Sequence, residues 1–408
     1  MEGSEPEVLV VGAGPAGVAA AITAADHGLD VLLADKATFP RDKACGDGLT
    51  TAALRRLEAL GLPRGAIDAM QPVREVVLVG PDGRRIGLTL PYGGSYATVS
   101  PRAELDDALV QLARQRGVTV REGAAVGSVS IGGDDAKVLF ADGASVRARH
   151  VVAADGHYSA VRRALHRDPP DLGSWHAFRQ YFSGVHDERL WVLFEEDLLP
   201  GYAWVFPLPG GRANVGYGVL RGPQTTGRRL ATLWRDLLTR PVLREILGPA
   251  AVAEGTVRAW PIPGALRPDS LADGPVLFVG DAAGVADPLT GEGIGQALET
   301  GVLAAEAIIG GGDAGEIASR YRRIVHRSLA RDLRFAAGIQ RLLRRPVVAR
   351  AALRAVDTSD WTRRNFARWM FEDYPRALVL TPDRWRRHAF APPAPFGTPD
   401  PGSHGTRS

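Results

Sequence analysis

The sequence predicts a mixed α/β protein in which a parallel sheet with helices is interrupted by an antiparallel sheet and followed by a helical C-terminal region. Three observations predict this. The chain opens with a strand–helix–strand pattern, short apolar strands return near residues 151–154 and 275–279, and residues 176–260 are mainly strand-like and aromatic. At 408 residues the chain is longer than a usual domain of ~150 residues, so more than one structural part is expected.

The elements follow in order along the chain. The opening unit is a strand at 8–11, an Ala-rich helix to about residue 27 and a strand at 31–33 that ends at Asp35. Ser100 and Pro101 are good starting residues for a helix that Gly117 ends. Thr290 is expected to open a long apolar helix that stops at the glycines 310–312. Further elements are expected as helices at 51–60, 159–165 and 228–238, and as a hairpin over 73–90 that turns at residues 81–83.

Composition excludes several classes of protein. Apolar residues make up 45% and charged residues 23%, which is ordinary for a globular chain. Cys45 is the only cysteine, so no intrachain disulfide can form and a cytoplasmic location is expected. The apolar stretch 8–25 is broken by glycines and preceded by acidic residues, so neither a signal peptide nor a membrane span fits it. No metal site is indicated.

Charge is concentrated near the C-terminus. Residues 331–390 contain fourteen Arg against six acidic residues, while the net charge of the whole chain is only +3. Residues 391–408 contain five Pro and three Gly and are expected to be a disordered tail. The basic region also holds aromatic residues, an arrangement that suits an anionic membrane surface and equally a solvated helix face over a core; the residues are Trp361, Arg363, Arg364, Phe366, Arg368, Trp369, Phe371, Arg384, Trp385, Arg386 and Arg387.

A glycine motif follows the first strand. Gly12, Gly14 and Gly17 fit the pattern G-x-G-x-x-G at a helix start, where small residues let backbone N–H groups approach a pyrophosphate. Asp35, eighteen residues after Gly17, suits a ribose hydroxyl. The motif predicts dinucleotide binding and leaves NAD and FAD open.

Two further acids stand at strand ends. Asp155 precedes Gly156 after the returning strand near 151, and Asp281 follows Gly280 after the strand near 275. Three such elements in this order resemble the FAD-binding pattern of the para-hydroxybenzoate hydroxylase fold. That resemblance implies a Rossmann-type FAD-binding domain formed by 1–72, 100–170 and 270–314. The strand-like pattern predicts an inserted antiparallel-sheet substrate domain formed by 73–99 and 171–269, and the Arg-rich remainder predicts a C-terminal helical region at 315–390.

Three motifs make the resemblance specific to one family within this fold. Residues 39–50 read FPRDKACGDGLT, residues 200–207 read PGYAWVFP and residues 287–294 read DPLTGEGI. Over residues 7–310 the chain resembles the geranylgeranyl reductase family of polyprenyl-reducing flavoproteins. The resemblance implies an FAD site that contains Gly12, Gly14, Pro15, Ala16, Gly17, Asp35, Lys36, Lys43, Cys45, Gly46, Arg102, Asp155, Gly156, Gly280, Asp281, Gly291, Gly293 and Ile294.

Catalytic and substrate-binding residues are expected in two of these motifs. Tyr202, Trp204 and Phe206 alternate along a strand, so they point to one face and form either ordinary sheet core or a wall for an isoprenoid chain. Tyr202 and Trp204 are therefore also candidates for catalysis. Cys45 is a candidate proton donor near the flavin, or a packing element that shapes the site.

The resemblance implies reduction of carbon–carbon double bonds in a polyprenyl lipid by FAD, with NADPH or NADH as electron donor. The first guesses for the substrate are the menaquinone side chain and a geranylgeranyl group, met at the inner face of the membrane by a peripherally bound enzyme; no nucleic-acid partner is expected. A flavin-dependent monooxygenase or halogenase is the main alternative, although the W-x-W-x-I-P signature of halogenases is altered at Tyr202 and Phe206. A further alternative is a prenyl-lipid carrier that has no catalytic activity.

Overall fold

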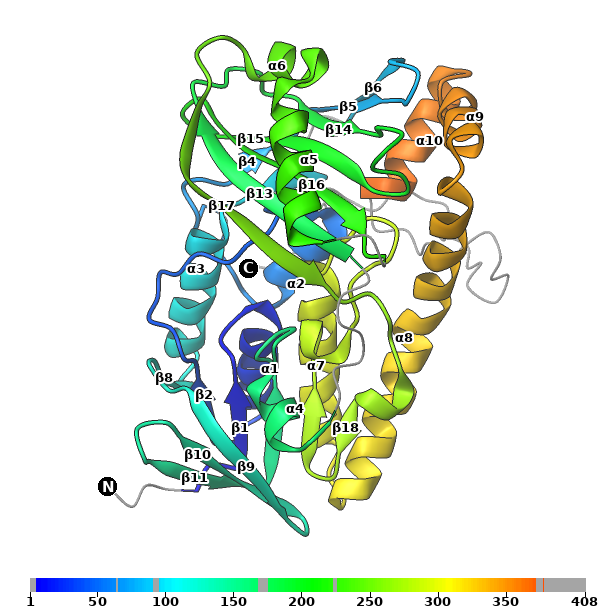
Figure 1. Ribbon diagram of the computed structural model, residues 1–408. Helices are drawn as coiled ribbons and strands as arrows, with labels where there is room; N and C mark the ends of the chain where they lie inside the picture. Colours follow the sequence, from blue (N-terminus) through cyan, green and yellow to red (C-terminus); the bar gives the residue numbers. More distant parts are fainter. Residues whose placement is uncertain are drawn as a thin grey trace, which may run out of the picture.

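The computed structural model describes residues 5–63, 65–90, 95–167, 175–222, 226–371 and 377. A six-stranded sheet with its helices forms one half of the molecule and a seven-stranded sheet forms the other, while helix α8 (Ala314–Leu343) runs along the side of both (Figure 1). The mixed α/β class predicted from the sequence is confirmed. The expected disordered tail at 391–408 lies outside the described residues.

The six-stranded sheet contains the opening unit of the chain. Its strands lie in the order β18-β19-β12-β1-β2-β8, and all neighbours are parallel except β18 and β19. In the central register Val10 pairs with Leu33 on one side and with Val152 on the other. The strands are β1 (Val8–Val11), β2 (Val31–Ala34), β8 (Thr119–Arg121), β12 (His150–Ala153), β18 (Ala272–Asp273) and β19 (Val276–Phe278).

Two helices from opposite ends of this part of the sequence pack closely together. Helix α1 (Pro15–Asp26) and helix α7 (Ile294–Ile309) meet where a Cβ added to Gly301 would lie 2.1 Å from the carbonyl oxygen of Ala16. Backbones approach this closely only where a side chain is missing. The small residues that give α1 its Ala-rich sequence therefore serve the packing against α7.

The seven-stranded sheet is antiparallel apart from the parallel pair β14 and β5. The hairpin predicted over 73–90 is confirmed, with Gly83 at φ +77° in its turn. In order, the strands are β17 (Val252–Ile262), β13 (Trp175–Ser183), β16 (Arg212–Leu220), β15 (Tyr202–Leu208), β14 (Leu190–Leu193), β5 (Glu75–Val79) and β6 (Arg85–Thr89).

Smaller elements complete the described chain. One small sheet is β11 (Ser145–Ala148), β10 (Asp135–Phe140) and β9 (Val126–Gly132); the other is β3 (Gly48–Thr50), β7 (Ala97–Val99) and β4 (Gln71–Pro72). The remaining helices are α2 (Thr51–Ala59), α3 (Arg102–Gln115), α4 (Ala160–Ala164), α5 (Gly227–Thr239), α6 (Pro241–Leu247), α9 (Pro346–Val356), α10 (Asp360–Phe371) and the short helices η1 (Pro268–Ser270) and η2 (Gly280–Ala283).

One predicted boundary is wrong. Helix α7 begins at Ile294 and not at Thr290, so Gly291 and Gly293 precede it. The side chain of Asp287 accepts hydrogen bonds from the amides at 289 and 290, and Gly291 adopts φ +71°. These bonds hold a turn where the sequence suggests a helical start. Helix α6 was not expected.

Candidate functional site

The glycine loop after β1 touches the end of β12. Gly12 adopts φ +104°, and a Cβ there would lie 2.4 Å from the carbonyl oxygen of Ala154. A Cβ at Gly17 would lie 1.8 Å from the carbonyl oxygen of Gly12. Both positions therefore require glycine, which brings the start of α1 against the carboxyl edge of the parallel sheet.

Asp35 closes this loop from the end of β2. Its Oδ2 accepts a hydrogen bond of 2.7 Å from the backbone N–H of Ala13, and its Oδ1 accepts one of 2.8 Å from Ala37. The Asp35 side chain is nearly buried, whereas the neighbouring Lys36 is exposed. The strand–turn–helix geometry expected for a dinucleotide is therefore present, with the acid beside the glycine loop.

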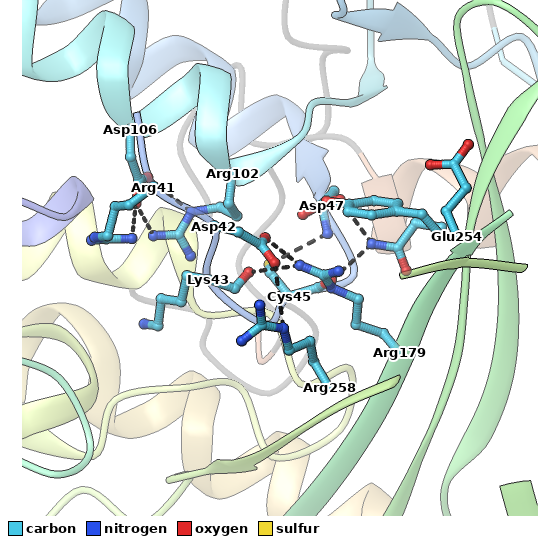
Figure 2. A network of polar contacts seen from close by, with 12 residues as sticks. Arg41, Asp42, Lys43, Cys45, Asp47, Arg102, Asp106, Arg179, Glu254 and Arg258 are labelled. Carbon is cyan, nitrogen blue, oxygen red and sulfur yellow. Dashed lines mark hydrogen bonds and ion pairs between the residues drawn. The ribbon is translucent and has the colours of Figure 1, made fainter. Parts of the chain in front are cut away.

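Two guanidinium groups lie over the start of α1. A Cβ at Gly14 would lie 3.7 Å from Nη2 of Arg41 and 3.9 Å from Nη2 of Arg102. Both arginines share one carboxylate, since Asp106 accepts two hydrogen bonds from Arg102 at 2.8 and 2.7 Å and forms a 2.8 Å ion pair with Arg41 (Figure 2). Burial alone would lower the pKa of Arg102, but Asp106 raises it, so the guanidinium stays charged.

This group of residues fits a pyrophosphate. Two cations face one carboxylate, which leaves one positive charge uncompensated beside the positive end of the α1 dipole. The space above Gly14 is one that a side chain would fill. The sequence indicated Arg102 as a cofactor residue, and the structure adds Arg41 and Asp106 around it.

The two later acids have different surroundings. Asp155 Oδ2 accepts hydrogen bonds from the amides of Ala160 (2.6 Å) and Val161 (3.1 Å), so this carboxylate caps the start of α4. Burial raises its pKa. Asp281 instead forms a 3.0 Å ion pair with Lys43. Burial would raise the pKa of Asp281, but Lys43 and other nearby cations lower it, so Asp281 stays ionised.

The glycines before α7 lie beside the same acid. A Cβ at Gly293 would lie 3.6 Å from Oδ1 of Asp281, and one at Gly291 would contact Ile262 at 3.5 Å. Glu292, between them, accepts a 2.9 Å hydrogen bond from the hydroxyl of Thr50. The turn ahead of α7 therefore contacts both Asp281 and the segment that follows Cys45.

The aromatic side chains of β15 form a continuous row. The ring centroids of Tyr202 and Trp204 are 6.0 Å apart, as are those of Trp204 and Phe206. Gly216 on β16 stands opposite Trp204, and a Cβ there would lie 2.3 Å from the indole ring. Glycine at 216 thus lets the ring lie on the sheet. We call Tyr202, Trp204 and Phe206 the aromatic wall.

The loop that contains Cys45 packs on the aromatic wall. Cβ atoms at Gly46 and Gly48 would lie 3.4 and 3.2 Å from Cε2 of Phe206. Tyr202 donates a hydrogen bond to the carbonyl oxygen of Thr290, which joins the wall to the turn ahead of α7. Three motifs far apart in the sequence therefore meet at one place.

Polar groups behind the wall connect it to the loop. Asn214 accepts a 3.0 Å hydrogen bond from Nε1 of Trp204 and donates 2.8 Å hydrogen bonds to the carbonyl oxygen of Cys45 and to Oδ2 of Asp47. Burial raises the pKa of the Cys45 thiol, although Arg102 opposes this effect. Arg179, on β13, contacts Asp42 and the carbonyl oxygen of Lys43 and so holds the same loop (Figure 2).

Sequence reasoning missed several polar partners at the site. They are Arg41, Asp106, Asp47, Asn214 and Tyr181, whose hydroxyl donates a 2.7 Å hydrogen bond to Oδ2 of Asp47. One signal was present. Asn214, Gly216 and Gly218 alternate along β16 and share the face of the aromatic wall, which polar and small residues rarely do in a purely apolar sheet core. No cluster of three side chains suited to a metal ion occurs in the described ranges, and no helix described there is long and apolar enough to cross a membrane.

Comparison with known proteins shows the family to which the chain belongs. Residues 5–310 match the model of the FAD binding domain family. The chain is 37% identical over 332 residues to a menaquinone reductase of Mycobacterium tuberculosis, covering 74% of this chain and 76% of that protein. It is 31% identical over 328 residues to a digeranylgeranylglycerophospholipid reductase of Methanosarcina mazei, covering 76% and 77%. A geranylgeranyl bacteriochlorophyll reductase-like protein of Thermoplasma acidophilum shares the fold, with a TM-score of 0.76, 23% identity, and coverage of 93% and 98%.

Proposed function

Because the chain belongs to the FAD binding domain family, and within it to the geranylgeranyl reductase family, we propose that it reduces carbon–carbon double bonds of a polyprenyl lipid. The side chain of menaquinone is the first candidate substrate and a geranylgeranyl group is the second. NADPH or NADH is the proposed electron donor. Bound FAD, once reduced, supplies the hydride.

The observation that carries this proposal is the aromatic wall packed against the Cys45 loop. An isoprenoid chain offers no hydrogen-bonding groups, so apolar surface must hold it. At about 0.8 kcal/mol for each CH2-sized group, burial of two five-carbon units contributes up to roughly 8 kcal/mol from water. A wall of three aromatic rings beside a pyrophosphate cradle meets this requirement.

The residues of the chain have separate roles in this proposal. Arg41, Arg102 and the start of α1 hold the pyrophosphate, while Tyr202 and Trp204 line the apolar part and exclude water. An isolated trisubstituted alkene is electron-rich, so the site must also supply a proton, which gives the alkene tertiary-carbocation character as hydride arrives. Cys45 is the proposed donor at the wall.

Halogenation is the less favoured alternative. The lysine nearest to the Cys45 loop in the sequence is Lys43, and its ammonium is ion-paired with Asp281 at 3.0 Å. An ion-paired lysine is better suited to a structural role in the cofactor site than to the role of a free catalytic amine.

The reaction itself is tested with the purified yellow protein. Anaerobic reduction should bleach the flavin, and a geranylgeranyl lipid without a quinone head group should then restore its colour and yield a product two mass units heavier. A stable reduced flavin in the presence of substrate would contradict the proposal. A C4a-hydroperoxide absorbance and an oxygenated product on mixing with oxygen would favour a monooxygenase.

The space above Gly14, which Arg41 and Arg102 face, gives a specific prediction. Gly14→Leu should fold normally, because the nearest atoms to a Cβ there are 3.7 Å away, but its side chain should occupy the pyrophosphate position. We expect FAD binding to weaken at least tenfold, a loss of about 1.4 kcal/mol. Flavin content per protein measures this. Gly227→Leu, in open space at the start of α5, should retain full FAD; equal FAD in both variants would contradict the assignment.

We also propose that the protein binds the membrane surface through its C-terminal helices. Arg363 is less suited to this role than the sequence suggested, since it pairs with Asp357 and Asp360. The large apolar side chains exposed on this part are Leu342, Val347 and Trp361, at 56%, 69% and 72%. The residues of the expected basic cluster beyond 371 lie outside the described residues. Apolar insertion is therefore the better-supported mode of contact.

A double substitution tests this contact. Trp361→Ser with Val347→Ser should reduce co-sedimentation with anionic liposomes severalfold, because the inserting side chains are lost. Val252→Ser, at a position 63% exposed on β17, is the matched control and should bind as the wild type does. Full activity on short water-soluble prenyl substrates without liposome binding would instead indicate an enzyme of soluble metabolites.

A further inference from the structure

Asp47 is a carboxyl group enclosed between the Cys45 loop and the seven-stranded sheet. Its side chain is fully buried, and its backbone adopts φ +64°. In the described residues only one other non-glycine residue, His166, has a positive φ. The backbone conformation costs energy that surrounding contacts must supply, and such residues cluster at functional sites.

The two carboxyl oxygens of Asp47 differ. Oδ2 accepts hydrogen bonds from the hydroxyl of Tyr181 (2.7 Å) and from Nδ2 of Asn214 (2.8 Å). Oδ1 is buried without a hydrogen-bond partner among the described residues. An ionised oxygen in that position is costly, so Oδ1 is the atom that takes up a proton.

The cations that face Asp47 are each paired with another acid. Arg179 on β13 pairs with Asp42, and Arg102 on α3 pairs with Asp106. Burial therefore dominates and raises the pKa of Asp47 to about 6, although Tyr181, Asn214, Arg179 and Arg102 all lower it. The carboxyl changes its protonation near neutral pH.

Cys45 is joined to this acid by hydrogen bonds. The backbone N–H of Asp47 donates a hydrogen bond of 3.3 Å to Sγ of Cys45, and Asn214 links the Asp47 carboxylate to the carbonyl oxygen of Cys45. Cys45 is only half-buried, whereas Asp47 has no exposed surface. Of the two residues only Cys45 has exposed surface, so we take its thiol as the group that reaches a substrate.

We propose that Asp47 is the proton reserve of the site, which restores the proton on Cys45 each time the thiol has protonated a substrate double bond. This role rests on the proposed function. Burial raises the pKa of the thiol above its ordinary value of 9.0, well above that of Asp47, so transfer from the carboxyl to a thiolate is downhill. Asp47 is in this sense a positioning residue, since it acts through Cys45.

Reduction of the alkene requires one proton and one hydride. The S–H bond of Cys45 breaks and a C–H bond forms at the less substituted alkene carbon. A bound reduced flavin would supply the hydride, and with it the two electrons, at the tertiary carbon. The O–H proton of Asp47 then passes to the thiolate, and a proton taken up from the solvent restores the carboxyl, whose ionised form accepts hydrogen bonds from Tyr181 and Asn214.

The first test does not depend on turnover. Infrared difference spectra of the FAD-loaded protein between pH 4 and 8 should show a protonated carboxyl band that disappears with a midpoint near 6 and is missing in Asp47→Asn. Because the chain has one cysteine, alkylation by iodoacetamide reports Cys45 without background. In Asp47→Asn the alkylation midpoint should move to lower pH, since the negative neighbour is lost.

The second test measures, against pH, flavin reoxidation by a geranylgeranyl lipid that has no quinone head group to accept the electrons directly. The wild-type rate should fall as pH rises through the Asp47 midpoint, because only the protonated carboxyl restores the thiol. Asp47→Asn should be at least tenfold slower and lack this dependence. Tyr181→Phe keeps the carboxyl but removes a hydrogen bond that favours its ionised form, so its midpoint should move to higher pH. Asp107→Ala, on the surface of α3, should behave as the wild type does.

The outcomes separate the two proposals. A wild-type protein whose reduced flavin is not reoxidised by any polyprenyl substrate contradicts the proposed function. A wild type that is reoxidised, with Asp47→Asn equal to it in rate and pH profile, overturns the role of Asp47 alone. If Asp47→Asn fails to fold, Tyr181→Phe decides, because an unchanged midpoint in that variant also overturns the proposal.

Discussion

Replacing Asp106 with alanine is expected to destabilise the protein by about 3 to 5 kcal/mol and to remove most of its flavin. The carboxylate is fully buried and pairs with both Arg41 and Arg102. Without it, two guanidinium groups of like charge face each other, and the one on Arg102 is almost completely removed from water. Breaking a buried pair in this way leaves an uncompensated charge.

Chemical denaturation and flavin content together check this prediction. Asp107→Ala is the matched control, because Asp107 is the next residue on α3 and only accepts a 3.3 Å hydrogen bond from Gln111 on the exposed side. It should change stability by less than about 0.5 kcal/mol. If Asp106→Ala were as stable as the control, the two arginines would not depend on this carboxylate.

Adding a methyl group at position 301 is also expected to lower the stability of the protein strongly. Gly301→Ala should lower the free energy of unfolding by about 3 kcal/mol, because the new Cβ would lie 2.1 Å from the carbonyl oxygen of Ala16 and 3.1 Å from the Cβ of Ala19. Neither contact can be relieved by rotating a side chain. Helices α1 and α7 must therefore separate, which also displaces the glycine loop.

A glycine-to-alanine substitution inside another helix should instead raise the free energy of unfolding. Gly338 lies inside α8 with nothing within 4 Å of an added Cβ, so Gly338→Ala should stabilise the protein by up to about 1 kcal/mol through helix propensity. Thermal unfolding of the two variants measures the contrast. Destabilisation of equal size in both would mean that close packing at Gly301 is not the cause.

The parallel sheet and the cofactor loop could be predicted because their signals are local. The apolar runs of the two strands, the glycines and Asp35 occupy one stretch of 28 residues from Val8, and the resulting geometry is as expected. The start of α7 was predicted wrongly because the determining contacts are side-chain hydrogen bonds from Asp287, which no propensity describes. The domain boundaries by residue range stay a prediction.

The polar half of the site could not be predicted because it depends on distant partners. Asp106 looks like an ordinary i+4 partner of Arg102 on a helix, and its second cation comes from a loop 65 residues away. Asp47 looks like a solvated loop acid between two glycines, and it is buried only because β13 and β16 supply Tyr181 and Asn214 over it. Burial of this kind arises from tertiary packing alone.

The order of strands in the six-stranded sheet has a consequence for biosynthesis. Strand β1 lies between β2 and β12, and β12 is flanked in turn by β19, which begins at Val276. At roughly 10 residues per second, a ribosome needs about half a minute after making β1 before β19 and α7 emerge. During that time the face of α1 that packs on α7 is uncovered. Chaperones that shield short apolar segments on nascent chains should therefore bind the N-terminal unit until the last strand arrives.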